Sequence, residues 1–416
     1  MSSYPKINKK KIMNDPVHGF INISYDLLFD LIEHSYFQRL RRIMQLGLTY
    51  YVYPGATHCR FQHVIGATHL MNLAIDVIRS KGHEITEIEA EAVSAAILLH
   101  DIGHGPFSHT LENIIIKDIN HEDLSKYFMN RLNAEFDNKL DLTIKIFNNK
   151  YKKKFLHQLV SGQLDVDRMD YLKRDSFFTG VSEGVIGSDR IIKMLNVVDD
   201  NLVIEAKGIY SIEKFLIARR LMYWQVYQHK TVLVAEQILI NTIKRAIYLA
   251  RNGENLFATS GLKYFLEDEI NKSNFLNNPE TLNYFASLDD TDIICSIKSW
   301  CSNSDTVLSE LSKRLINRQL FKIEMQYTPF DESKVHKIKE LVIKKYNLSQ
   351  ENADYFVITD KISINAYSDF DDRINILFKN GETKDITEAT DMLNHDVLSK
   401  TVIKYYLIYP KECSIK

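Results

Sequence analysis

Three histidines and an aspartate fall within ten consecutive positions of this 416-residue sequence, in the segment from His100 to His109. Gly103, Gly105 and Pro106 interrupt the segment, so the backbone has to leave one helix there. Such a bend lets adjacent His and Asp side chains point at one ion. Imidazole and carboxylate are ligands for a divalent ion of intermediate hardness. A lone buried histidine is more often a hydrogen-bonded core residue, but this density predicts a metal site.

The order of the chemical residues along the chain resembles that of a known superfamily. Arg60-x-x-His63, His100-Asp101 and Asp167 reproduce the H...HD...D order of the HD superfamily. Further segments resemble its deoxynucleoside triphosphate triphosphohydrolases, above all those that also carry a sterile-alpha-motif domain: Asp15-Pro16-Val17-His18-Gly19, Phe37-Gln38-Arg39-Leu40, Tyr53-Pro54-Gly55-Ala56-x-His58 and Tyr227-Gln228-His229-Lys230. The likeness is strongest from about residue 13 to residue 250.

The resemblance implies a divalent metal ion held by His63, His100, Asp101 and Asp167. Mg, Mn, Fe and Zn all remain open as its identity. Such an ion acidifies bound water and draws charge from a phosphoryl oxygen. In the family, attack on the α-phosphate releases a deoxynucleoside and inorganic triphosphate.

Further histidines match active-site positions of the family. They are His104, His109 and His121, and Glu112 stands where the acidic partner of His121 is usually Asp. An ordinary histidine pKa near neutrality suits proton delivery to a leaving oxygen. We favour His109 as the general acid.

A triphosphate needs local cations, because the whole chain has a formal net charge of only -2. The candidates are Arg60, Arg168, Arg219 and Lys230. On one continuous helix, Arg219, Tyr227 and Lys230 would share a face, as would Asp167, Tyr171 and Asp175 on an earlier helix. An ordinary solvated face is the alternative interpretation of Arg219 and Lys230.

The resemblance also assigns nucleoside contacts. Gln45 and Asp175 would bond the sugar 3'-hydroxyl, and Tyr171 would exclude a 2'-hydroxyl. Leu46 and Tyr227 would border the base, which leaves base preference open because every base has a π face.

Regulatory positions match less well. A guanine nucleotide activator would contact Glu33, Gln38 and Arg41, with Glu33 replacing Asp. A second nucleotide site would include Val52, Arg190 and Lys207, but Glu205 stands where a cation is expected and would repel phosphate. Since these family sites lie between subunits, the resemblance implies a homo-oligomer, either a dimer or a tetramer.

The elements that position these residues are predicted to be mainly α, forming an HD-domain helical bundle. Apolar residues recur at helical spacing from Tyr25 to about Arg318, and the predicted helices include one over Leu27–Ile43 and a very long one over Ser211–Arg251. Thr86 with Glu89 predicts a capping box, and Asn120 predicts a helix that begins at His121.

Alternating β-branched segments follow about Pro329. The predicted strands cover 355–359, 362–367, 374–378 and 402–409, with a turn at Asn380-Gly381. We therefore expect a helical HD core with a helical extension over residues 1–328 and a small C-terminal α+β lobe over residues 329–416.

The composition argues against several classes of protein. Four scattered cysteines argue against a disulfide framework, and a reducing cytoplasm is the simplest location. No apolar stretch is long enough for a transmembrane helix or a secretory signal, and the net charge of -2 gives no support for nucleic-acid binding.

Two other functions remain open from sequence. One is a different HD phosphohydrolase that acts on nucleoside monophosphates or cyclic nucleotides. The absence of an H-D-x-x-E-D pattern at His100 argues against an alarmone hydrolase. The other is a nonenzymatic nucleotide-binding regulator, against which a complete set of metal ligands argues.

Overall fold

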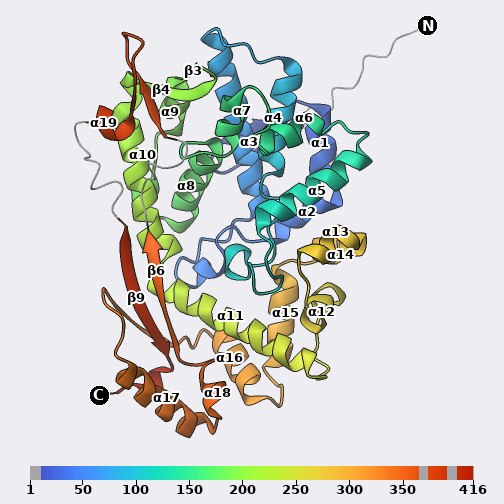
Figure 1. Cartoon of the computed structure of the whole chain (residues 1–416), viewed down its shortest axis with the longest axis vertical. Helices are drawn as coiled ribbons and strands as arrows, with labels where there is room; N and C mark the ends of the chain where they lie inside the picture. The colour runs from blue at the N-terminus through green and yellow to red at the C-terminus, as the bar shows by residue number, and fades with distance from the viewer. Residues whose placement is uncertain (1–10, 365–372, 391–400, 416) are drawn as a thin grey trace.

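Two long helices, α3 (Arg60–Ser80) and α4 (Glu87–Leu99), pack side by side in the upper half of the molecule (Figure 1). The structure is a computed structural model that describes residues 11–364, 373–390 and 401–415. The helices around this pair are α1 (Asp26–Glu33), α2 (Ser35–Gln38), α5 (His121–Glu135), α6 (Asp141–Phe147), α7 (Lys154–Val160), α8 (Val166–Thr179), α9 (Ser188–Met194) and α10 (Ile209–Met222). The mainly α fold predicted from sequence is confirmed.

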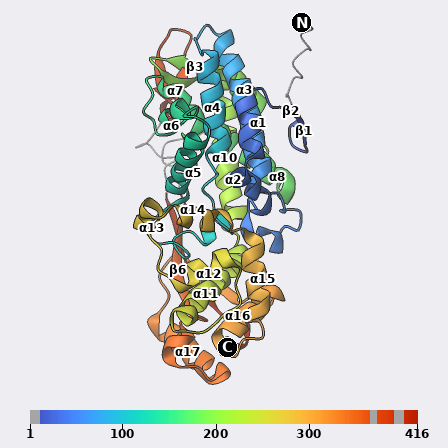
Figure 2. The same cartoon turned by 90° about the vertical axis from the view of Figure 1, so that its right-hand side faces the viewer.

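A second group of helices forms the lower half of the molecule (Figure 2). Its members are α11 (Lys230–Arg251), α12 (Ser260–Glu267), α13 (Lys272–Asn277), α14 (Pro279–Ala286), α15 (Asp290–Trp300), α16 (Thr306–Ile316), α17 (Glu332–Tyr346) and α18 (Gln350–Ala353). The short α19 (Ile386–Ala389) lies apart from them, beside α10 and α9 in Figure 1. None of the helices in the described ranges is both long and apolar enough to cross a bilayer.

Local sequence signals place several helix starts. The capping box of α4 is present, since the Thr86 hydroxyl accepts from the Glu89 amide and the Glu89 carboxylate accepts from the Thr86 amide. The Asn120 side chain accepts from the amide of Asp123, so α5 begins at His121 as predicted. These caps satisfy amides that have no partner within the helix.

Two predicted helices are broken. The helix predicted over Leu27–Ile43 is interrupted at His34, whose extended backbone ends α1. The His34 ring accepts a hydrogen bond from the amide of Tyr36, and α2 begins there. A 3₁₀ turn, Arg39–Arg42, follows α2. The helix predicted over Ser211–Arg251 is divided into three elements. The α-helix α10 ends at Met222, and a π-helical turn, Tyr223–Tyr227, follows it. His229 has an extended backbone, and α11 begins at the next residue. Apolar spacing persists through both breaks, which is why the pattern alone predicts single helices.

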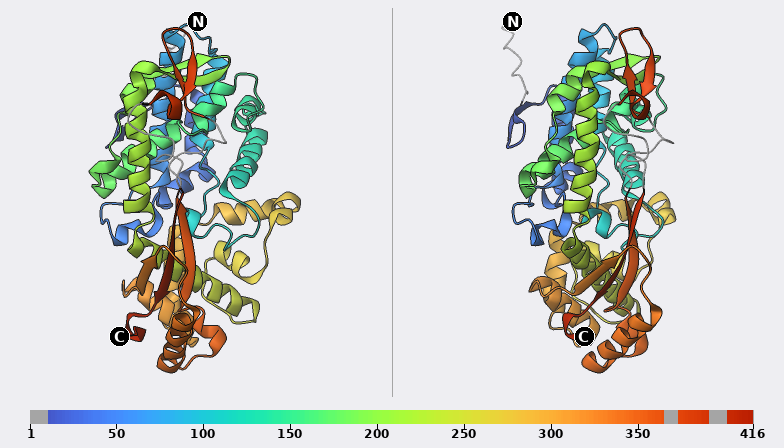
Figure 3. Two further views of the ribbon diagram at one scale, coloured as in Figure 1. Left: turned by 60° about the vertical axis from the view of Figure 1, so that its left-hand side comes forward. Right: turned by 90° about the vertical axis from the view of Figure 1, so that its left-hand side faces the viewer.

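Strands join segments far apart in the sequence. A hairpin of β1 (Ile12–Asp15) and β2 (Gly19–Asn22) precedes α1. The four-stranded sheet has the order β3 (Leu195–Val198), β4 (Asn201–Glu205), β7 (Asn375–Leu377) and β8 (Thr383–Asp385), and the three-stranded sheet has the order β5 (Lys322–Gln326), β9 (Val402–Tyr409) and β6 (Ile358–Ile364). Figure 3 shows the β7–β8 hairpin at the end of the molecule opposite α17.

The C-terminal strands are largely as predicted. β9 has the predicted bounds, and Gly381, with φ of 84°, lies in the turn between β7 and β8. The first predicted strand starts at Ile358 instead of Tyr355, because α18 and a turn extend to that point. The strand predicted over 362–367 forms the end of β6, and its residues 365–367 lie outside the described residues. The boundary at residues 328 and 329 stays a prediction; β7 lies parallel to β4 of the helical core.

Candidate metal centre and active site

Four side chains from three elements converge on one point. His63 lies in the first turn of α3, His100 and Asp101 follow the last turn of α4, and Asp167 lies in the first turn of α8. His63 Nε2 is 3.0 Å from Asp167 Oδ1, which is also 3.4 Å from His100 Nε2. His100 Nε2 is 3.2 Å from Asp101 Oδ1. Because α3 and α4 both pack into the two hydrophobic clusters of the core, their ends are rigid supports for this group.

The donor set fits a divalent ion. The Nε2 atoms of His63 and His100 are buried and lack a hydrogen-bond partner among the described residues, although carboxylate oxygens lie nearby. Their Nδ1 atoms are engaged by Asp170 Oδ2 at 2.8 Å and by the carbonyl oxygen of Ile97 at 2.6 Å. A buried polar atom without a partner costs about 1–3 kcal/mol, so a bound cation accounts for both nitrogens.

The electrostatics of the centre favour added positive charge. Burial alone would lower the pKa of His63, but Asp167 and Asp170 outweigh it and raise that pKa to about 10. Two imidazoles and two carboxylates therefore form a centre whose excess of negative charge a divalent ion would neutralise.

Asp170 contacts the Nδ1 atom of His63, on the side of the ring away from the metal centre. Its carboxylate is fully buried and engages His63 Nδ1 at 2.8 Å, His18 Nε2 at 2.7 Å and Arg174 Nε at 2.9 Å. Burial would raise the pKa of Asp170, but Arg174 and the two histidines hold it well below its usual range. Arg174 also donates to Asp15 at 2.7 Å. This network fixes the His63 ring with Nε2 directed at the metal centre, and sequence reasoning missed it because its members interact only after folding.

Replacing Asp170 with Asn should weaken metal binding by about 10–100-fold, since the amide no longer fixes the ring orientation and basicity of His63. Titration of the apoprotein with Mn²⁺ measures this. Asp15→Asn is the matched control, because it removes the negative charge from another acceptor of Arg174 and does not contact His63. Equal metal affinity of Asp170→Asn and the wild type would refute the supporting role.

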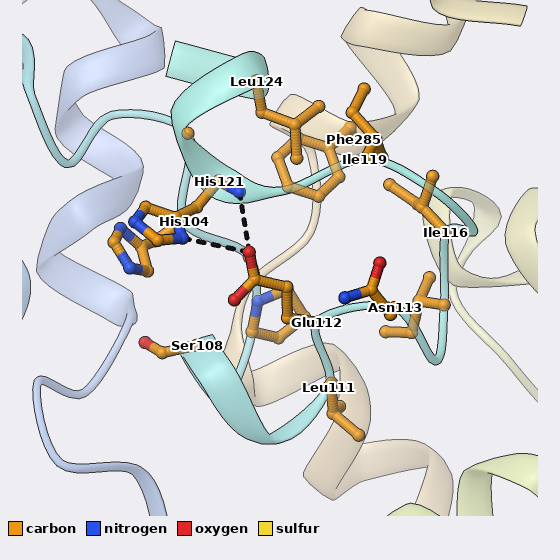
Figure 4. Close-up of a pocket in the computed structure, with 14 residues that line it drawn as sticks. His104, Ser108, Leu111, Glu112, Asn113, Ile116, Ile119, His121, Leu124 and Phe285 are labelled. Atoms are coloured by element: carbon orange, nitrogen blue, oxygen red, sulfur yellow. Dashed lines mark hydrogen bonds and ion pairs between the residues drawn. The ribbon is translucent and has the colours of Figure 1, made fainter. Parts of the chain in front are cut away.

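A second group of histidines lies beside the metal centre. The rings of His104 and His121 are stacked with centroids 4.0 Å apart, and the His109 ring is 5.1 Å from each. Glu112 Oε1 accepts from the amide of His121 at 2.9 Å and lies 3.0 Å from its Nδ1 (Figure 4). Glu112 Oε2 is 3.2 Å from His109 Nδ1. The longer Glu side chain therefore reaches both histidines.

Hydrogen bonds from both histidines hold the pKa of Glu112 well below its usual range, although burial would raise it. The Glu112 carboxylate orients both His109 and His121 through these contacts. A small pocket of about 40 Å³ is lined by His104, Glu112 and His121 together with apolar side chains such as Leu124 and Phe285 (Figure 4). Its lining includes none of the four candidate metal ligands, so it lies beside the metal centre.

The four predicted phosphate-binding cations differ in their surroundings. Arg60 donates to Ser108 Oγ at 2.8 Å and pairs with Asp101, and Arg168 pairs with Asp165. Lys230 is exposed at the start of α11. Arg219 differs from these, since its Nε and Nη1 atoms are buried without a hydrogen-bond partner among the described residues.

The predicted nucleoside residues gather near Tyr171, whose ring centroid is 6.4 Å from that of His63 and 6.2 Å from that of Tyr227. The Tyr227 hydroxyl donates to Asp175 Oδ2 at 2.8 Å, and His58 Nε2 is 2.7 Å from Asp175 Oδ1. The sequence motif contains His58 but does not indicate this contact with Asp175. Gln45 Oε1 is buried without a partner among the described residues, and Leu46 packs at the edge of the core.

Arg219, Tyr227 and Lys230 do not share the face of one helix, so that part of the sequence argument is wrong. Arg219 lies on α10, Tyr227 ends the π-helical turn, and Lys230 begins α11. The π-helical turn directs Tyr227 at Asp175, and such turns often occur at functional sites.

Comparisons with known proteins agree with this geometry. Residues 60–175 match the HD domain, and residues 186–259 match the HD associated region. A phosphohydrolase from Bacteroides thetaiotaomicron, known from its crystal structure, is 54% identical with a TM-score of 0.94, over 97% of this chain and 100% of that one. The uncharacterized protein YwfO of Bacillus subtilis is 31% identical, over 99% of this chain and 95% of that protein. This chain belongs to the HD phosphohydrolase family.

The family identifies a hydrolase and accounts for the metal-binding donor set. The HD domain match contains all four candidate ligands, and the HD associated region contains Arg219 and Tyr227. A deoxynucleoside triphosphate triphosphohydrolase SAMHD1 homolog of Dictyostelium discoideum is 35% identical over 248 residues, which are 55% of this chain and 48% of that protein. The chain thus spans about half of that relative.

The predicted regulatory residues of this HD phosphohydrolase lie on the surface around α1 and α2. Glu33 pairs with Lys11 at 3.4 Å, and Gln38 donates to the Ile32 carbonyl at 2.7 Å and accepts from Arg41 Nε at 2.9 Å. At the second site, Lys81 compensates the charge of Glu205 at 2.8 Å, and Arg190 donates to the Lys207 carbonyl at 3.0 Å. Nucleotide activation and a homo-oligomer stay predictions.

Glu236 on α11 should make the stability of this protein depend on pH. Burial raises its pKa from 4.5 to about 7, and Thr110, next to His109, donates to it at 3.1 Å. Because the folded pKa is the higher one, the stabilisation is complete below pH 4.5 and is lost as pH rises through 7. Glu236→Gln should therefore be more stable than the wild type at pH 8, by about 3 kcal/mol.

Denaturant unfolding of the wild type and Glu236→Gln at pH 5 and pH 8 measures this difference. Glu267→Gln, at an exposed position on α12, is the control and should retain the wild-type pH dependence. An unchanged pH dependence in Glu236→Gln would show that this carboxyl group titrates as an exposed one.

Proposed function

We propose that this HD phosphohydrolase is a metal-dependent deoxynucleoside triphosphate triphosphohydrolase. The observation that carries the proposal is Arg219, whose Nε and Nη1 atoms are buried without a hydrogen-bond partner among the described residues. Arg219 lies close enough to Tyr171 to offset part of the rise that burial causes in the pKa of the Tyr171 hydroxyl. Tyr171 in turn neighbours His63 of the metal centre. An arginine that is free to bind an anion near a metal centre suits a substrate with several phosphates, because both groups can bind phosphate oxygens.

The reaction would divide among the residues as follows. His63, His100, Asp101 and Asp167 would hold the ion, which when bound would acidify water and withdraw charge from the phosphate. Arg219, Arg168, Arg60 and Lys230 would bind the triphosphate. A water oxygen would bond to the α-phosphorus as the bond from phosphorus to O5' breaks. His109 would give its proton to O5', and Glu112 would keep the imidazole oriented.

Selection of a deoxynucleoside would depend on the residues around Tyr171. His58 and Tyr227 fix both oxygens of Asp175, and Gln45 retains a buried acceptor for the 3'-hydroxyl. Tyr171, packed between His63 and Tyr227, would leave no space for a 2'-hydroxyl. The site has no predicted polar contact to the base, so all four deoxynucleotides are expected as substrates.

A nucleotide panel tests the proposal. The protein is incubated with Mn²⁺ or Mg²⁺ and each of the four deoxynucleoside triphosphates or the four ribonucleoside triphosphates, and the products are separated by anion exchange. We expect deoxynucleoside and inorganic triphosphate in equal amounts from the deoxy compounds. Release of pyrophosphate or monophosphate, with no triphosphate from any of them, would overturn the proposal. It would favour a different phosphoesterase.

A further inference from the structure

One carboxylate outside both matched family segments holds two loops of the active site. Asp290 is the first residue of α15, and only 8% of its surface is exposed. Its Oδ1 accepts from the amide of Phe107 at 2.7 Å, and its Oδ2 accepts from the amide of Met44 at 2.8 Å. Hydrogen bonds from amides to a buried carboxylate are stronger than those between neutral groups, so this side chain fixes both segments firmly.

The first segment carries His109. Phe107 and Ser108 have φ of 52° and 47°, a left-handed conformation that residues other than glycine adopt only where their surroundings impose it. Asp290 holds the amide of Phe107, while Arg60 donates to the Ser108 hydroxyl at 2.8 Å. These two contacts keep the turn in the conformation that directs His109 toward Glu112.

The second segment carries the nucleoside contacts. Met44 precedes Gln45 and Leu46, and the amide of Gln45 donates to the His58 carbonyl at 2.9 Å. The bond from Met44 to Asp290 and the bond from Gln45 to His58 lie on consecutive residues, so together they fix the backbone from which the Gln45 side chain extends.

We propose that Asp290 is a positioning residue that couples the nucleoside-binding loop to the turn carrying His109. The two loops share one short side chain with a single rotatable carboxylate, so a displacement of either loop changes the hydrogen bond of the other. The coupling would align O5' of the bound nucleoside with the proton on His109. The catalytic part of this inference rests on the proposed function.

Hydrogen exchange tests the coupling without reference to activity. In Asp290→Asn, one carboxylate oxygen becomes an N–H₂ group that faces a backbone N–H, so that the contacts to both loops are weakened. Peptides over residues 43–48 and 105–111 should both exchange about tenfold faster than in the wild type. Asp292→Asn is the matched control: it lies in the same turn of α15, accepts from the amide of Asp289 at 2.7 Å, and should leave both peptides unchanged. Faster exchange in only one peptide, or in neither, would overturn the coupling.

Kinetics test the catalytic consequence. With a deoxynucleotide substrate, Asp290→Asn should lower kcat and raise KM, each about tenfold, with unchanged metal content, whereas Asp292→Asn should change neither. Wild-type kinetic constants in Asp290→Asn would overturn the positioning role.

If the wild type cleaves no deoxynucleotide, the proposed function fails, and the exchange experiment still decides the coupling. If Asp290→Asn does not fold, Asp290→Glu, which shifts the carboxylate by one methylene, should accelerate exchange in both peptides, and unchanged exchange would refute the inference.

Discussion

Asp167→Asn should lose metal and phosphohydrolase activity together. Asp167 Oδ1 lies 3.0 Å from His63 Nε2 and 3.4 Å from His100 Nε2, so it joins the two histidine ligands. The amide of Asn has no negative charge and binds a divalent ion weakly. Because the ion supplies several kcal/mol of transition-state stabilisation, kcat/KM should fall at least about 10³-fold.

Elemental analysis of the purified variant and product release from a deoxynucleotide measure both effects. Asp76→Asn, an exposed position on α3, should retain the wild-type metal content and activity. An Asp167→Asn protein that held the metal and hydrolysed the substrate at the wild-type rate would exclude Asp167 as a ligand.

Features encoded by short segments could be predicted from the sequence. The starts of α4 and α5 follow from their capping residues Thr86 and Asn120, whose side chains bind amides within the same helix turn. The bounds of β9 follow from eight alternating or β-branched residues. By contrast, spacing alone does not place His63, His100 and Asp167 together; the order of the motifs and the resemblance to the HD superfamily predicted that, and the structure brings these side chains together.

Features that depend on distant contacts could not be predicted. The break at Tyr223–Tyr227 leaves the apolar periodicity intact, and its consequence is the bond from Tyr227 to Asp175 on another helix. Likewise, β7 pairs with β4 across more than 150 residues, which no local pattern specifies. The sequence does not single out Asp170, because its partners His18 and His63 lie more than 100 positions away.

His109→Gln should lower kcat by about 10²–10⁴-fold and leave KM and metal content nearly unchanged, as expected for loss of a general acid. The His109 side chain is 69% exposed and engages Glu112 at 3.2 Å, so its replacement should disturb the fold little. His34→Gln is the matched control, because His34 also pairs with a glutamate, Glu135, at 3.1 Å, but lies away from the metal centre.

The leaving group distinguishes proton donation from other roles of His109. An alkoxide at O5' needs a proton as its bond to phosphorus breaks, whereas a nitrophenolate leaves without one. With nitrophenyl triphosphate as substrate, His109→Gln should therefore approach the wild-type rate, while Asp167→Asn should remain inactive. If His109→Gln lost the same factor with both substrates, His109 would act by binding the phosphate. The proton for O5' would then have to come from another group, such as His121, which the same Glu112 holds.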